Sequence, residues 1–343
     1  DSYNTAVGGG AGRQVTTGKE NTLIGGLAGD ALTTGSNNVA VGFEALSTED
    51  AHGNNVAIGN RALKTLNAGA AGENVAVGDD AGLSITTGIR NTLIGGVAGD
   101  ALTDADFNTA VGQQAISTDT LGSHSTGIGY GALGTQNFTT ATDTYNTAVG
   151  SLAGTAVTTG IQNSFLGGTV GQSLTTGGSN AAFGYQALRD DTLGSFSVAL
   201  GSRALKFQNF TTATDSYNTA VGYAAGLQVT TGQFNTLIGG SAGTALTTGN
   251  NNVALGYAAL ASDTLGDRNV ALGRAALLSQ NFTTTTDSYN TAVGYDAGLS
   301  VTTGTVNTLI GGLAGDALTT GNSNVAVGYS ALSTGTGDAG VVA

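Results

Sequence analysis

The sequence predicts an all-β parallel β-solenoid, and three observations support this. A short motif recurs at a fixed period, side chains alternate within that motif, and the chain contains no proline. A fixed-period repeat is typical of proteins that stack identical layers. Proline is confined to sheet edges, first positions and bulges, so its absence fits layers that lie inside a continuous ladder.

The motif is Asn-(Thr/Val)-(Ala/Leu)-(Val/Ile)-Gly, and it begins nineteen times, mostly with a 17-residue period. Successive intervals of 17, 17, 17 and 21 between motif starts define a 72-residue superrepeat of four coils, the first superrepeat being slightly shorter. We therefore expect one repetitive domain, 1–343, with superrepeats at about 1–70, 71–142, 143–214, 215–286 and 287–343. The motif begins at Asn4, Asn21, Asn38, Asn55, Asn74, Asn91, Asn108, Ser125, Asn146, Asn163, Asn180, Ser197, Asn218, Asn235, Asn252, Asn269, Asn290, Asn307 and Asn324.

The first residue of the motif, which is usually Asn, is numbered position one of each coil. Positions two and four share one face and position three the other, which is strand periodicity. Position five is always Gly, which predicts a strand end with positive φ or a close approach of a neighbouring coil. Position eight is Ala in every coil except at Val170, which predicts room for one methyl group.

Large apolar residues alternate between two other positions. Position nine is Gly in the first two coils of a superrepeat (Gly12, Gly29) and Leu or Ile in the last two (Leu46, Leu63), whereas position twelve is apolar in the first two and mostly polar in the last two. We expect each layer to keep one large apolar plug. A second short strand is expected over the recurring Leu-Thr-Thr-Gly segment.

A single 17-residue coil buries few side chains, and the entropy of ordering it is large. Burial between subunits would compensate, so a homotrimer is expected. At about 4.8 Å per layer, nineteen coils predict a rod of roughly 90 Å.

The segments "NSNVAVGYSAL" (322–332) and "NTAVGYDAG" (290–298) resemble the head repeats of trimeric autotransporter adhesins. The longer pattern "NTAVGYxAGxxxTTGxxNTLIGG" is similar to Gly- and Thr-rich repeats of phage tail-fibre and bacterial surface proteins. The likeness covers about residues 1–335. It implies a trimeric fibrous shaft, although the 17-residue period is longer than the coil of the adhesin heads.

Charge and composition limit the possible partners. The net charge of −13 repels phosphate backbones, so nucleic acid is not expected. No run of 18 or more apolar residues occurs, so membrane insertion is not expected either. The glycines of 7–12 and 24–29 recur as turn residues, which explains them better than a phosphate-binding loop does. We expect no cofactor and no metal.

Several polar groups also have simple structural explanations. His52 and His124 are interpreted as solvated turn residues, and the Asn residues of position one as a stacked ladder. The Thr-Thr-Gly segments occur only in the first two coils of each superrepeat, which breaks the flat face that ice binding requires. A set of acids is interpreted as caps or solvated turns, with cation binding between subunits as the alternative: Asp30, Asp100, Asp316, Asp143, Asp215 and Asp287.

The fourth coil of three superrepeats is four residues longer than the others, and the extra residues lie within 136–146, 208–218 and 280–290. Insertions in solenoids map to surface loops on one face, often the binding face. Each carries a Phe and a Tyr at a fixed spacing, either as a staple over the shaft or as a contact with a glycan or protein receptor. The candidate contact residues are Phe138, Tyr145, Phe210, Tyr217, Phe282 and Tyr289.

The sequence thus predicts a non-enzymatic structural or adhesive fibre shaft, extracellular or on a cell or virion surface, that mediates attachment or assembly. An ice- or surface-binding solenoid is one alternative. A polysaccharide-active solenoid enzyme is another, and it would require paired acids on one face in adjacent layers.

Overall fold

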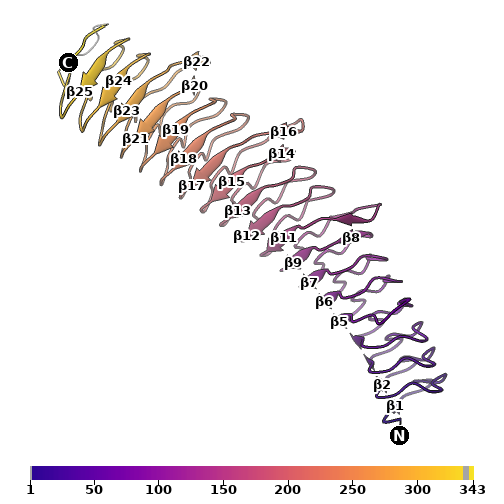
Figure 1. The fold of residues 1–343 in the computed structure, drawn as a ribbon. Helices are drawn as coiled ribbons and strands as arrows, with labels where there is room; N and C mark the ends of the chain where they lie inside the picture. The colour runs from indigo at the N-terminus through magenta and orange to yellow at the C-terminus, as the bar shows by residue number, and fades with distance from the viewer. Residues whose placement is uncertain (1, 335–339) are drawn as a thin grey trace. The chain divides into compact units, whose positions relative to one another are not determined.

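The computed structural model describes residues 2–334 and 340–343, which form a parallel β-solenoid whose coils follow the predicted 17-residue period. The chain divides into two compact units, Asp1–Thr169 and Val170–Ala343. Within the described part of each unit, each coil contributes one three-residue strand, and the strands stack side by side into a parallel sheet (Figure 1).

The stacked strands begin one residue after each motif start. In the first unit they are β1 (Thr5–Val7), β2 (Thr22–Ile24), β3 (Val39–Val41), β4 (Val56–Ile58), β5 (Val75–Val77), β6 (Thr92–Ile94), β7 (Thr109–Val111), β9 (Thr126–Ile128), β11 (Thr147–Val149) and β12 (Ser164–Leu166). In the second unit they are β13 (Ala181–Phe183), β15 (Val198–Leu200), β17 (Thr219–Val221), β18 (Thr236–Ile238), β19 (Val253–Leu255), β21 (Val270–Leu272), β23 (Thr291–Val293), β24 (Thr308–Ile310) and β25 (Val325–Val327).

The register places each position on the same position of the next coil. Thr5 pairs with Thr22, Ala6 with Leu23 and Val7 with Ile24, and later pairs within each unit repeat this match. Because strand side chains alternate, position three points into the coil and positions two and four point out. Each outward row therefore runs from coil to coil without a shift.

The core contains the large apolar side chain that the sequence predicts for each layer. Position three, Ala at position eight and one large residue at position nine or twelve are buried in coil after coil. Gly29 occupies position nine because a Cβ there would lie 2.8 Å from Leu23 Cδ2 and 2.9 Å from Leu32 Cδ1. A Leu at position three or twelve thus fills the space that a Leu at position nine fills in other coils.

The Gly of position five is required both by its positive φ and by the close approach of the next coil. Gly95 has φ +137°, and a Cβ on it would lie 2.6 Å from the carbonyl carbon and oxygen of Gly112 in the next coil. The backbones of neighbouring coils therefore approach each other at a point where an L side chain has neither the space nor the conformation.

The predicted second strand over Leu-Thr-Thr-Gly is wrong. That segment bends instead, because the backbone N–H groups of Thr16, Thr17 and Gly18 all donate to the carbonyl of Thr33, at 2.9, 3.2 and 3.2 Å. Three donors on one acceptor cannot form the evenly spaced bonds of a parallel ladder.

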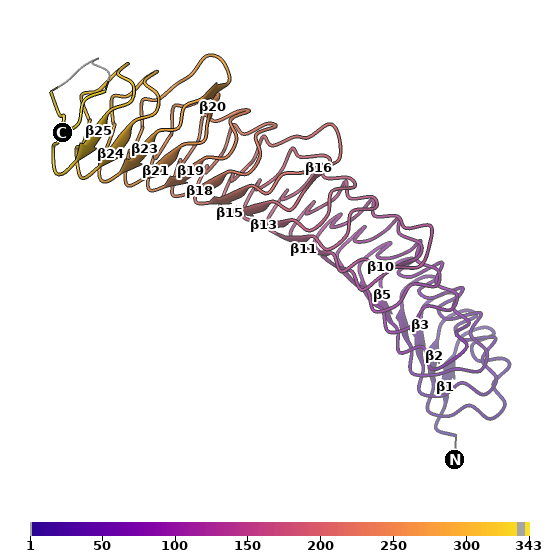
Figure 2. The same cartoon turned by 45° about the horizontal axis from the view of Figure 1, so that its top comes forward.

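Second strands occur only where third and fourth coils meet, within the part of the chain that the structure describes, and they pair in parallel. They are β8 (Gly122–Ser123) with β10 (Thr142–Asp143), β14 (Gly194–Ser195) with β16 (Thr214–Asp215), and β20 (Gly266–Asp267) with β22 (Thr286–Asp287). In Figure 2, β16 and β20 lie on the side of the coil away from the main strands β15 and β21. In these three places, the insertion of the fourth coil therefore supplies one of the two paired strands.

Candidate binding surfaces

The Asn residues of position one form the ladder that the sequence predicts. Asn91 donates from Nδ2 to the carbonyl of Ala105 at 2.8 Å and to Asn74 Oδ1 at 3.2 Å, and its Oδ1 accepts the N–H of Asn108 at 2.9 Å. These side chains are buried, and the same bonds recur along each unit. The ladder is part of the fold, which leaves these amides no free group for a ligand.

A buried polar network at the third and fourth coils is not expected from the sequence. Asp119 accepts the N–H groups of Gly122 and Phe138 and the Nε2 of Gln136. Gln136 Nε2 also donates to Ser125 Oγ, and its Oε1 accepts Asn146 Nδ2 at 2.9 Å. Ser125 interrupts the Asn ladder, and the glutamine bridges that interruption.

The same network recurs in the next two superrepeats, and each set is buried. The equivalents are Asp191 with Gln208, Ser197 and Asn218, and Asp263 with Gln280 and Asn290. Burial raises the pKa of Asp191, although hydrogen bonds from Gln208, Phe210 and Gly194 oppose the shift. A polar residue at position twelve together with a four-residue excess was the available sequence signal.

The insertions divide their aromatic residues between two roles. Phe138, Phe210 and Phe282 are buried, with 6%, 3% and 5% of their surface exposed, so they pack under the loop and are out of reach of a receptor. Tyr145, Tyr217 and Tyr289 are about half exposed, at 54%, 50% and 50%. The staple interpretation therefore fits the phenylalanines, and receptor contact remains a prediction for the tyrosines.

Each of these tyrosines is the last residue of a fourth coil, and it packs on the last residue of the third coil before it. The ring of Tyr145 lies 5.2 Å from that of His124, and Tyr217 lies 5.3 Å from Phe196. Arg268 takes the corresponding place over Tyr289, at 5.5 Å. The rings of Phe107 and Phe234 extend the first two stacks, at 4.9 and 5.6 Å.

The two histidines are not simple solvated turn residues. His52 Nδ1 lies 3.2 Å from Oε1 of the buried Glu49, and His124 Nδ1 lies 3.1 Å from Asp143 Oδ1. Glu49, Asp50 and His52 place ligand atoms within 4.8 Å of one another. Both oxygens of Glu49 already accept backbone N–H groups, those of His52 and Ala68. This cluster therefore resembles a closed turn more than a metal centre.

The recurring acids have varied surroundings. Asp30 pairs with Arg13 at 3.5 Å, Asp287 pairs with Arg268, and Asp215 is exposed. Burial raises the pKa of Asp100, and the charge of Asp80 in the preceding coil adds to that rise. Asp80 is paired with Arg61. In Asp100 and Asp316, buried Oδ1 atoms have no hydrogen-bond partner.

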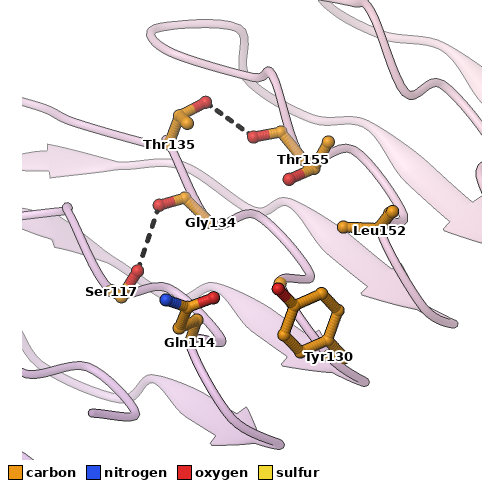
Figure 3. Close-up of a pocket in the computed structure, with 8 residues that line it drawn as sticks. Gln114, Ser117, Tyr130, Gly134, Thr135, Leu152 and Thr155 are labelled. Atoms are coloured by element: carbon orange, nitrogen blue, oxygen red, sulfur yellow. Dashed lines mark hydrogen bonds between the residues drawn. The ribbon is translucent and has the colours of Figure 1, made fainter.

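A pocket of about 270 Å³ lies on coils of the first unit, around Gln114, Ser117 and Tyr130 (Figure 3). Its lining is neutral: an amide, a phenol, the hydroxyls of Thr135 and Thr155, and the backbone of two glycines. An uncharged polyhydroxylated ligand matches such groups. At the two positions that hold Gly131 and Gly134, other superrepeats carry larger residues, namely Arg61 with Lys64, Arg203 with Lys206, and Ala275 with Leu278.

The outward rows of positions two and four form a surface that we call the sheet stripe. Position two is Thr in ten coils and Val in seven, and position four is always Val, Ile, Leu or Phe. Ten position-four side chains, among them Ile94 and Leu255, are 37–59% exposed, and the other nine are partly buried. Aromatic side chains at position six border the stripe, and they are exposed: Phe43, Tyr130, Tyr185, Tyr223, Tyr257, Tyr295 and Tyr329.

A scan against protein-family models finds no match to the chain, and a search of curated proteins finds none either. Among the described residues, no helix has the length and apolar character needed to cross a bilayer. The structure itself shows a repetitive parallel β-solenoid.

Proposed function

We propose that the chain is a non-enzymatic structural shaft of an extracellular fibre, carried on a cell or virion surface and built from three copies. The observation that carries this proposal is that the buried polar side chains form hydrogen bonds with other parts of the solenoid. The asparagines, Asp119 and Gln136 are all occupied in bonds between coils. Side chains committed to stacking suit a part whose task is to hold its shape.

Attachment is the second part of the proposal. Tyr145, Tyr217 and Tyr289 each belong to one of the three insertions and are exposed, and the neutral pocket at Tyr130 lies on coils of the first unit. Both would suit a glycan or protein receptor that is uncharged or weakly charged, because the acidic chain would repel an anionic one.

Light scattering on the purified chain tests the shaft. Three copies of 33.4 kDa give about 100 kDa, which is the expected mass. A monomer at all concentrations would overturn the oligomeric shaft. A glycan array probed with the wild type and with Tyr130→Ala tests attachment: we expect the variant to lose any neutral-glycan signal, and equal binding would reject the pocket as the contact.

Binding to ice or another ordered surface is a second candidate, and the threonines of position two favour it. Position two places ten threonines on the outward face of the strands, at most one in each coil. The Thr-Thr-Gly segments are less suited, because hydroxyls such as those of Thr33 and Thr230 donate to carbonyls of the next coil. Thermal hysteresis of a monomeric sample would support this candidate, and its absence would reject it.

A further inference from the structure

We propose that the sheet stripe is the surface through which copies of this chain associate side by side, in parallel and with matching coils. This inference rests on the proposed multi-copy shaft and names the surface that holds the copies together. The occupant of the stripe is thus a second copy of the same chain.

The distribution of charge sets the stripe apart from the rest of the molecule. The chain has 23 acidic and 10 basic residues, and none of these falls at positions two to five of any of the nineteen coils. At position six, which borders the stripe, only Asp79 and Arg274 are charged. Charges occur on the bends and insertions, at residues such as Asp104, Asp143 and Arg189. A strip free of charge on an acidic protein is where two copies can approach without bringing like charges together.

Composition also fits a protein interface. Interface cores are depleted in charged residues and enriched in aromatic side chains, with tyrosine among them. The stripe presents half-exposed apolar side chains that vary in size from Val7 to Phe183, and exposed tyrosines border it. Side chains of different size can interdigitate with a partner, whereas an ice-like plane requires uniform rows.

The area is sufficient for a stable contact. Positions two to six span about 16 Å of extended chain, and coils repeat about every 4.8 Å, so each coil offers roughly 80 Å². The ten coils of the first unit alone would then contribute about 800 Å², which is the usual share of one partner in a stable complex. Position-four side chains that are still 37–59% exposed supply apolar surface for burial.

Periodicity favours a second copy over an unrelated partner. The outward rows repeat at every coil without a change of register within each unit. Only a partner with the same axial spacing can meet each row with an equivalent row, and a parallel copy related by rotation about the long direction meets this condition. A globular partner would cover a few coils and leave the others exposed.

The test places the same added charge on and off the stripe. The stripe variant carries Ile94→Lys and Ile128→Lys, both on outward, exposed positions of β6 and β9. The matched control carries Thr17→Lys and Thr159→Lys, which are exposed on the bends of the same unit. A milder variant with Ile94→Thr and Ile128→Thr keeps strand-favouring side chains, so that misfolding can be separated from loss of contact.

Light scattering with circular dichroism gives the answer. We expect the wild type and the control near the mass of three copies, and a folded stripe variant near 33.4 kDa. A folded stripe variant that keeps the wild-type mass would overturn this inference while leaving the shaft proposal standing. A wild-type dimer that the stripe variant dissociates would support the stripe and contradict the trimer. A monomeric wild type would overturn both.

Discussion

Replacing Asn91 with alanine should show how much one rung of the Asn ladder stabilises the solenoid. The substitution removes the Nδ2 bond to the carbonyl of Ala105 and the Oδ1 bond to the N–H of Asn108, and both bonds are buried. An unsatisfied buried donor or acceptor costs about 1–3 kcal/mol, so two of them predict a loss of about 2–6 kcal/mol in the free energy of unfolding. Urea denaturation followed by circular dichroism measures this loss.

Asn67→Ala is the control, because Asn67 lies in the same unit with its side chain exposed. It should change the free energy of unfolding by less than about 0.5 kcal/mol. Hydrogen exchange adds a local readout, since the amide of Asn108 should lose protection in Asn91→Ala before amides of distant coils do. A loss for Asn91→Ala as small as that of the control would refute the reasoning that the ladder stabilises the fold.

Three further substitutions test other features, each by urea unfolding against a matched control. Gly95→Ala should cost about 2–6 kcal/mol from strain and overpacking, whereas Gly96→Ala, where a Cβ meets nothing within 4 Å, should cost little; equal losses would contradict the close approach. Phe210→Ala should cost about 3–5 kcal/mol as a buried ring, and the exposed Tyr217→Ala much less, an order that a receptor-facing Phe210 would reverse. Because burial raises the pKa of Asp191, its contribution to stability is largest below its ordinary pKa and is lost as pH rises through the raised value. The stability of the wild type relative to Asp191→Asn should therefore grow as the pH falls from about 7 to 4, with the exposed Asp215→Asn showing no such trend.

The repeat made the fold predictable because each coil acts as an internal control for the others. The invariance of Gly8 and its equivalents indicated a backbone constraint, and the exchange between Gly29 and Leu46 indicated shared core space. The bends at Thr16–Thr17 were missed because threonine favours strands, and local propensity does not reveal that three N–H groups share one carbonyl.

The network at Ser125 was missed for a different reason. Gln136, Asp119 and Asn146 come together across coils, and residue type alone suggests a solvated position for glutamine and aspartate. Non-glycine residues with positive φ, such as Leu46, Phe107 and Ile116, were equally hard to predict, because branched and bulky side chains rarely adopt that conformation. The structure of the neighbouring coils imposes it.

The bridge between Ser125 and Gln136 also bears on how such a chain could lengthen during evolution. The third coil supplies Asp119, the fourth coil supplies Ser125, Gln136 and the insertion, and the coil after it supplies Asn146, so these coils depend on one another. Duplication of a DNA segment that separated them would leave a gap in the ladder. Duplication of the complete four-coil segment would preserve every contact. Inheritance would therefore favour whole superrepeats as the unit of growth, and natural length variants should differ by multiples of four coils.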